Sequence, residues 1–100
     1  MNYRNEDLLK AVRSLSCAHC SHPPRVQAAH SNLIEHGKGM RIKAHDYAIM
    51  ALCGENQNRC HFELDNGNKM SKTERRLFTY EMIAKTYMAL MAQGKLKVVI

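Results

Sequence analysis

Four cysteines are spaced as two pairs that could hold one metal ion. Two residues separate Cys17 from Cys20, and six separate Cys53 from Cys60. Paired thiolates on tight turns present four sulfur ligands tetrahedrally to zinc, and the first pair has the usual spacing of such a turn. The alternative is four ordinary buried thiols. Because a chain of 100 residues builds only a modest core, a metal that staples its turns adds stability. The spacing therefore predicts a structural zinc site at Cys17, Cys20, Cys53 and Cys60.

A second set of candidate ligands follows the last cysteine. His61 and Asp65 are four residues apart in the segment HFELD, and on a helix this spacing places both side chains on one face. Imidazole and carboxylate ligands with open positions suit Mg²⁺, Mn²⁺, Ni²⁺ or Zn²⁺, so the ligand types do not choose the catalytic metal. The alternative makes His61 a helix cap or an extra zinc ligand and leaves Asp65 as a solvated acid.

Two further positions could move a proton. His30 ends the short apolar stretch VQAAH, and an unperturbed histidine titrates near ~6.5, which suits a general base at neutral pH. Asp46 precedes an apolar run and adjoins His45, so either side chain could complete a site with His30. The alternative for His30 is an ordinary packed or exposed histidine.

The charge balance favours a polyanionic partner such as DNA. The chain has 15 Lys and Arg against 9 Asp and Glu, a net charge of +6. A positively charged surface attracts the phosphate backbone of a nucleic acid and so raises its concentration near the protein. Contacts of this kind are salt-dependent and largely independent of sequence. Each basic side chain taken alone can equally be a solvated surface charge. The candidate DNA-binding residues are Lys38, Arg41, Lys43, Arg59, Arg75 and Arg76.

Composition and length bound the class of protein. Hydrophobic residues make up 45% of the chain and charged residues 24%, which is typical of one soluble globular domain over residues 1–100. No stretch approaches the ~20 apolar residues of a membrane span, so no membrane association is expected. The N-terminus has no apolar signal region, which predicts a cytoplasmic protein. In a reducing cell, four thiols favour a metal over disulfides.

Local patterns predict the elements that would position these residues. We expect a helix over residues 2–16 capped by Asn5, a short strand over 25–30, and a long basic loop over 31–46. The apolar run 46–52 is compatible with a strand or a short helix. A polar turn over 53–60 then leads to a short helix that begins at His61 and stops near 66–67.

The C-terminal region predicts one long helix. Ser71 and Glu74 form a capping box, and Gly94 is placed to end the helix after Gln93. The tail, residues 95–100, is expected to pack as a strand or to fray. The apolar stripe of this helix is predicted to be core, and part of it could serve a homodimer interface. The stripe comprises Leu77, Tyr80, Ala84, Tyr87, Met88 and Met91.

The order of these segments resembles a known family. A Cys-x-x-Cys knuckle is followed by AAHSN, the glycine-bearing basic loop HGKGMRIKAHDY, an LC…CHFELD element and the helix start SKTERR. This order resembles the HNH endonucleases (the ββα-metal or His-Me finger superfamily) that carry a zinc knuckle. The similarity is greatest to the small phage and prophage YbcO-like nucleases, and it runs from about Cys17 to about Phe78.

The resemblance implies a fold, an activity and residue roles. The fold would be α+β, a small zinc-stapled ββα-metal finger with an N-terminal helix and a long C-terminal helix. The activity would be metal-dependent DNA cleavage, with His30 as general base and His61 and Asp65 as ligands of the catalytic metal. The family's central Asn or Asp, which orients the base or assists the metal, would be Asp46, with His45 as its rival.

One departure from the family pattern keeps other functions open. Many of these enzymes have a histidine or aspartate just before the base as a further metal ligand, and here that position is Ala29. One alternative is a catalytically degenerate, zinc-stapled module that binds DNA. The other is a zinc-stabilised protein-interaction domain.

Overall fold

The chain has an α+β fold built around one β-hairpin. The computed structural model describes residues 2–21, 26–54, 60–65 and 69–97. Within them the elements follow in the order α1 (Glu6–Arg13), β1 (Val26–His30), β2 (Ile49–Cys53), α2 (Cys60–Asp65) and α3 (Lys72–Ala92). The α+β class and the strand predicted near residues 25–30 are confirmed. In the apolar run 46–52, strand β2 begins only at Ile49, and residues 46–48 form a turn before it. The turn predicted over 53–60 lies mostly outside the described residues, as does the end of the tail.

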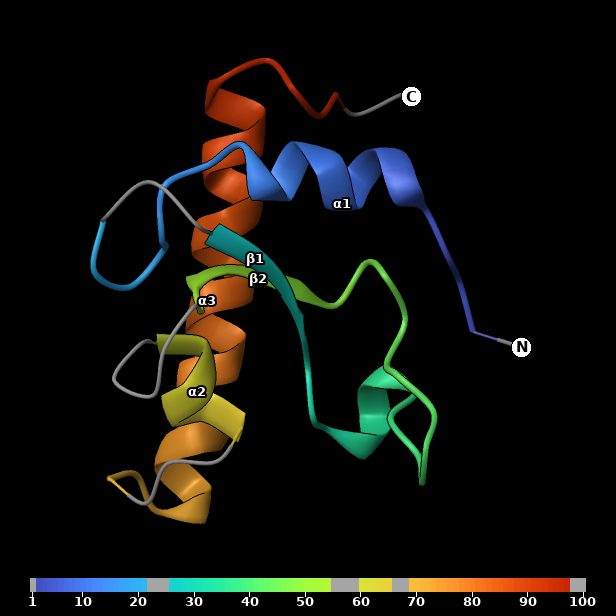
Figure 1. Ribbon diagram of the computed structural model, residues 1–100, viewed down its shortest axis with the longest axis vertical. Coiled ribbons are helices and arrows are strands. Elements are labelled where there is room, and N and C mark those ends of the chain that lie inside the picture. The colour runs from blue at the N-terminus through green and yellow to red at the C-terminus, as the bar shows by residue number, and fades with distance from the viewer. Residues whose placement is uncertain (1, 22–25, 55–59, 66–68, 98–100) are drawn as a thin grey trace.

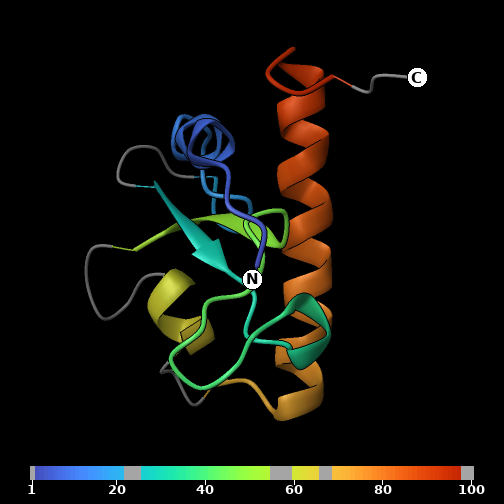
Figure 2. The same cartoon turned by 90° about the vertical axis from the view of Figure 1, so that its right-hand side faces the viewer.

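The hairpin lies at the centre of the molecule (Figures 1 and 2). Strands β1 and β2 are antiparallel, and the register pairs Val26 with Cys53 at one end and His30 with Ile49 at the other. Helix α3 runs along one side of the hairpin and packs on β2, α1 crosses β1 and β2, and α2 packs on β2 (Figure 2). Every residue of β2 is buried, which explains why its sequence, IMALC, is apolar without alternation.

Helix α1 is shorter than the predicted span of 2–16. Its cap is Asn5, as predicted, whose side chain accepts a hydrogen bond from the backbone N–H of Leu8 at 3.1 Å. Residues before the cap are extended because they hydrogen-bond to the loop between the strands instead. For example, the backbone N–H of Tyr3 donates to the His45 ring, and the Tyr3 carbonyl accepts from the backbone N–H of Asp46.

The long loop between the strands is ordered by its own hydrogen bonds. It contains a 3-10 helix, Ile34–His36, and a tight turn in which Gly39 and Ile42 exchange two backbone hydrogen bonds of 3.1 Å. Ser31 is fully buried, and its hydroxyl bonds the His36 ring at 2.6 Å. The residues that follow His30 at the end of β1 are thereby held in place.

Helix α3 has the predicted capping box and ends at Ala92, with Gly94 at a φ of 71°. Its buried face, however, is not the predicted stripe. Leu77, Met88 and Met91 are exposed, as are Tyr80 and Ala84, and Tyr87 is only half-buried. The buried residues are Thr79, Met82, Thr86 and Leu90. A homodimer through the exposed stripe stays a prediction.

The prediction of the α3 core stripe is wrong because two threonines occupy the core. Thr86 donates its hydroxyl proton to the Met82 carbonyl at 2.7 Å, and the same oxygen accepts the backbone N–H of Ala51 in β2 at 3.0 Å. The Thr79 hydroxyl donates to the Arg75 carbonyl at 2.8 Å. With their polar atoms satisfied, both threonines pack as small apolar side chains.

The structure also bears on membrane spans. In the part of the chain that it describes, none of the helices combines the length and the apolar character that a membrane-crossing helix needs.

Replacing Thr86 by valine tests this account of the core. The variant keeps the shape of the side chain but leaves the buried N–H of Ala51 without an acceptor, which costs about 1–3 kcal/mol. We expect the free energy of unfolding, measured by urea denaturation, to fall by that amount. The control is Thr73→Val at an exposed position of the same helix, which should change stability by less than about 0.5 kcal/mol. Equal effects of the two variants would contradict the account.

Candidate functional site

The four cysteines form one cluster. Their sulfur atoms all lie within 4.8 Å of one another, and the sulfurs of Cys20 and Cys53 are 3.5 Å apart. Four sulfurs bound tetrahedrally at about 2.3 Å from a zinc ion are about 3.8 Å from each other, so the cluster has the size of a metal site. None of these four cysteines forms a disulfide. The cysteines are therefore placed to bind a metal ion, as the sequence predicted.

Each part of the cluster comes from a different element. The turn with Cys17 and Cys20 is tied to β2 by a hydrogen bond of 2.8 Å from the Ala18 N–H to the Ala51 carbonyl. Cys53 is the last residue of β2 and Cys60 the first of α2. A bound ion would thus join the turn, the strand and the helix.

The thiols in the cluster compete for ionisation. Burial favours a neutral Cys17, but hydrogen bonds from the backbones of Cys20, Cys53 and His19 outweigh it and lower the pKa of Cys17 to about 7. Burial, followed by interactions with the thiols of Cys53 and Cys17, raises the pKa of Cys60. Without a cation the cluster therefore favours a thiolate at Cys17 and opposes one at Cys60. A divalent cation would remove this repulsion between neighbouring thiolates.

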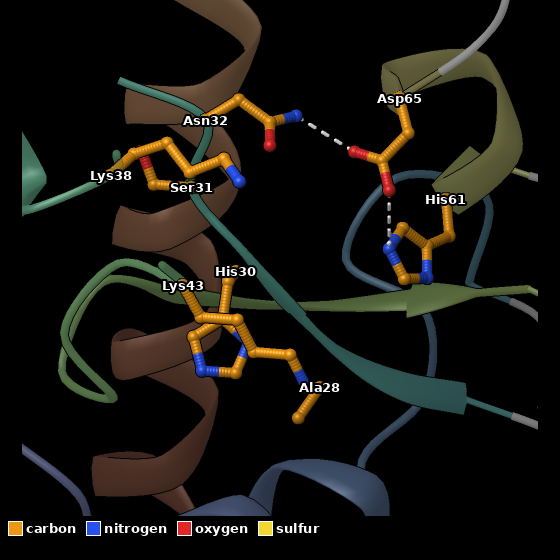
Figure 3. Close-up of a pocket in the computed structure, with 8 residues that line it drawn as sticks. All are labelled: Ala28, His30, Ser31, Asn32, Lys38, Lys43, His61 and Asp65. Atoms are coloured by element: carbon orange, nitrogen blue, oxygen red, sulfur yellow. Dashed lines mark hydrogen bonds and ion pairs between the residues drawn. The ribbon is translucent and has the colours of Figure 1, made fainter. Parts of the chain in front are cut away.

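A cavity of about 290 Å³ lies at the other end of the hairpin (Figure 3). It brings together His30 at the end of β1, His61 and Asp65 on α2, and Lys38 and Lys43 from the loop. These residues are up to 35 positions apart in the sequence. The remaining residues that line the cavity are Ala28, Ser31 and Asn32.

His30 is held by a buried carboxylate. Its Nε2 lies 2.7 Å from Oδ1 of Asp46, whose side chain is only 3% exposed. Asp46 also accepts from the Arg4 guanidinium at 3.0 Å and from the backbone N–H of Asn5 at 2.6 Å. Burial favours the neutral acid, but the hydrogen bonds from His30, Asn5 and Arg4 prevail and lower the pKa of Asp46. The carboxylate thus fixes the Nε2 side of the ring and leaves Nδ1 as the nitrogen that can take a proton.

His45, the alternative to Asp46 as the residue that completes a site with His30, faces the N-terminal segment. Its Nδ1 accepts the backbone N–H of Tyr3 at 2.9 Å, and its ring stacks on Tyr47 with the centroids 4.7 Å apart. Between the two candidates, Asp46 is the one that meets His30. Because its oxygens accept from Arg4 and Asn5 and contact His30, Asp46 is placed to orient the His30 ring rather than to bind a metal.

His61 and Asp65 meet one turn apart on α2, as their spacing predicted. Nε2 of His61 is 3.0 Å from Oδ2 of Asp65, while Nδ1 of His61 contacts Oε1 of Gln27 at 2.6 Å. The Asn32 amide donates to Oδ1 of Asp65 at 2.7 Å. Burial raises the pKa of Asp65, but the hydrogen bonds from His61 and Asn32 outweigh it, and the net shift is downward. An ionised carboxylate beside an imidazole nitrogen fits a divalent cation.

This pair would give a cation only two protein ligands. Among the residues that the structure describes, the cysteine cluster is the one place where three or more ligand side chains converge. Ala29 is fully buried opposite Met50 in the hairpin and supplies no ligand. A cation held by His61 and Asp65 would keep its other positions for water and substrate oxygens.

The contacts of His61 depend on the glycine after the last residue of β2. A Cβ atom at Gly54 would overlap with the carboxamide of Gln27. Gly54 therefore leaves room for Gln27 to reach Nδ1 of His61, which directs Nε2 toward Asp65.

The predicted DNA-binding residues divide into two groups. Lys38 and Lys43 line the cavity, and Arg41 is exposed on the tight turn between them. Arg75 instead donates to the Leu64 carbonyl at 2.7 Å at the end of α2, and Arg76 pairs with Glu35. Arg59 lies outside the described residues.

Sequence reasoning missed the residues that support the site. Gln27 and Asn32 hold the two candidate metal ligands, and Arg4 and Asn5 hold Asp46. These contacts link positions 33 to 42 residues apart, so no local pattern could reveal them. The one available signal was the place of Asn32, two residues after the candidate base.

Comparison with known proteins adds no relative. The chain matches no protein-family model, no curated protein and no solved structure. The resemblance to the HNH endonucleases therefore rests on the residues of the sequence alone.

Metal content tests the cysteine cluster. We expect one tightly bound ion per chain by elemental analysis, and a thiolate-to-metal charge-transfer band after exchange with Co²⁺. Cys20→Ser should lower both the metal content and the melting temperature, because the ion joins three elements of the fold. The control is Ser21→Ala, a neighbouring exposed position outside the cluster. An unchanged melting curve after chelation would show that the cysteines are ordinary thiols.

Acid unfolding tests the role of Asp46. Because the folded state lowers the pKa of this carboxyl, its contribution is present above the unfolded value of about 3.9 and is lost as the pH falls through the lower folded value. Asp46→Asn should reduce the free energy of unfolding at neutral pH by about 1.5–3 kcal/mol, the range for lost hydrogen bonds to a charged group, since His30 and the half-exposed Arg4 lose the anion that they contact. Stability should then depend less steeply on pH below about 4.

The control for this experiment is Asp7→Asn. Asp7 is exposed in the first turn of α1, where its charge contributes less than about 1 kcal/mol. Equal pH dependence of Asp46→Asn and the wild-type protein would mean that the Asp46 carboxylate does not stabilise the fold.

Proposed function

We propose that this protein is a metal-dependent DNA endonuclease of the HNH type. The observation that carries the proposal is that one cavity collects a histidine paired with a buried aspartate, a His–Asp pair suited to a cation, and two lysines. They lie on β1, on α2 and in the loop between the strands, and the elements of this part of the chain follow the order β1, β2, α2, which is the ββα arrangement that the resemblance implies. Phosphodiester hydrolysis needs a base, a means to neutralise phosphate charge and a way to hold the backbone, and each has a candidate here.

His30 would act as the general base. Its Nδ1 would take a proton from the attacking water, and the Asp46 carboxylate 2.7 Å from Nε2 would stabilise the imidazolium that forms. Asp46 acts through His30, so it is a positioning residue. Because the serine after His30 is fully buried and bonded to His36, the base is held from both sides.

His61 and Asp65 would hold the catalytic cation. When bound, the cation would supply Lewis-acid neutralisation of charge on the scissile phosphate and the leaving oxygen. Gln27 keeps Nε2 of His61 directed toward Asp65, and Asn32 holds the other oxygen of that carboxylate. These donors suit Mg²⁺, Mn²⁺, Ni²⁺ or Zn²⁺ alike. Lys38 and Lys43 would hold the DNA backbone beside the cavity.

Zinc is the ion that best fits the cysteine cluster. Four thiolates in a tetrahedral arrangement of this size favour zinc in a structural role. Cys60 begins α2 and His61 follows it, so zinc would anchor the helix that carries the candidate catalytic ligands. A helix of six residues is too short to be stable alone, and the Arg75 contact at its other end adds a second anchor.

A DNA-binding module with a degenerate site is the second candidate. The observation that favours it is the buried Ala29, which leaves the cation two protein ligands. Such a module would keep Lys38 and Lys43 for phosphate contacts but would not cleave DNA.

A plasmid-nicking assay separates the two functions. We expect the wild-type protein to nick supercoiled DNA in the presence of Mg²⁺, Mn²⁺, Ni²⁺ or Zn²⁺. His30→Ala should lower the rate at least about 100-fold, which is the typical contribution of a general base, without weakening DNA binding. The matched control is His45→Asn, whose amide can still accept the Tyr3 N–H, and it should cut like the wild-type protein. Binding without cutting, with every metal, would contradict the nuclease and support the module.

A further inference from the structure

The most exposed large apolar side chain of the described residues belongs to the loop whose two lysines line the candidate active site. Met40 is 90% exposed, at the tip of the tight turn formed by residues 39–42. A methionine side chain left in water forgoes the stabilisation that burying its apolar surface would provide. The two lysines that line the cavity, Lys38 and Lys43, flank this turn.

The turn is held rigidly with respect to His30. Gly39 and Ile42 exchange two backbone hydrogen bonds, and the Asn2 amide donates to the carbonyls of Gly37 and Lys43, both at 2.8 Å. The Arg4 guanidinium donates to the Lys43 carbonyl at 2.9 Å and to Asp46 at 3.0 Å. One arginine thus clamps both the base of the turn and the carboxylate that holds His30. The tip of the turn therefore has a fixed position relative to the candidate base.

The charges around Met40 select the kind of partner. Lys38, Arg41 and Lys43 surround it in sequence, and the segment from 37 to 45 contains no acidic residue. An apolar tip between cations is complementary to a stack of bases that lies between two phosphate backbones. A neutral apolar protein surface would leave these cations unpaired.

We propose that Met40 inserts between stacked bases of the DNA duplex that binds at the cavity. This inference rests on the proposed function and adds how the substrate is recognised. Apolar wedges of this kind partly unstack a base step and kink the duplex. Because unstacking costs least where pairing is already disturbed, the protein should bind a duplex that contains a mismatch more tightly than a fully paired one.

The test uses His30→Ala protein, so that the DNA stays intact, and short duplexes that carry 2-aminopurine with or without an adjacent mismatch. Binding should increase the fluorescence of 2-aminopurine, because the probe brightens when it is unstacked. Adding Met40→Ala should abolish this increase, weaken binding about tenfold as the loss of a contact at an interface centre does, and remove the preference for the mismatch. The matched control is Met88→Ala on α3, also an exposed methionine. It should behave like the His30→Ala parent.

The outcomes distinguish this inference from the proposed function. DNA binding without a fluorescence increase, or equal effects of Met40→Ala and Met88→Ala, would overturn the wedge and leave the nuclease proposal standing. Failure to bind any duplex would overturn both proposals. Because Met40 is exposed, Met40→Ala should melt like its parent, so a change in the fluorescence increase reports on the contact with DNA.

Discussion

The buried carboxylate of Asp46 is the constraint on which the rest of the arrangement depends. A charge removed from water must be paired and hydrogen-bonded, or it destabilises the fold by several kcal/mol. Asp46 meets this requirement with partners from three places: Arg4 in the N-terminal segment, the backbone of Asn5 at the start of α1, and His30 at the end of β1. The same contacts that satisfy the charge therefore set the start of α1, the course of the loop and the orientation of the candidate base.

The cysteine cluster plays the equivalent part at the opposite end of the hairpin. Val26 pairs with Cys53 there, whereas His30 pairs with Ile49 beside the cavity. The two ends are linked through α2, because Cys60 belongs to the cluster and Asp65, at the other end of the same helix, lines the cavity. A metal bound by the cysteines would fix the six-residue helix against β2. Such a metal would explain how a small chain holds several polar side chains in a defined geometry without a large apolar core.

Local signals in the sequence were sufficient for much of this fold. The cap of α1, the capping box of α3 and the paired cysteines each involve residues close together, and the structure has all three. The buried face of α3 could not be predicted in this way. Thr79 and Thr86 look polar, and they are buried because their hydroxyls bond carbonyls of their own helix and, for Thr86, the N–H of Ala51 on a neighbouring strand. The apolar residues Leu77 and Met88 were therefore predicted to be buried, whereas both are exposed.

In the candidate site, too, some features could be predicted from local sequence and others could not. The four-residue spacing of His61 and Asp65 was enough to place them together, because a helix fixes that geometry. The choice between His45 and Asp46 was not accessible, since it depends on which of two adjacent residues the N-terminal segment contacts. The backbone N–H of Tyr3 donates to the His45 ring, and the Arg4 guanidinium donates to the Asp46 carboxylate. Both contacts span about 40 residues of sequence. The contacts of Gln27 with His61 and of Asn32 with Asp65 could not be predicted for the same reason, because they join residues far apart in the sequence.

The proton positions on the His30 ring test the central claim most directly. A long-range ¹H–¹⁵N NMR spectrum, recorded at alkaline pH where histidine is neutral, reports which ring nitrogen carries the proton. Because Nε2 of His30 lies 2.7 Å from the Asp46 carboxylate, we expect the proton on Nε2 and a bare Nδ1 that can accept a proton from water. A His30 ring protonated at Nδ1 would contradict the account, because Asp46 would then not hold the base in its working form.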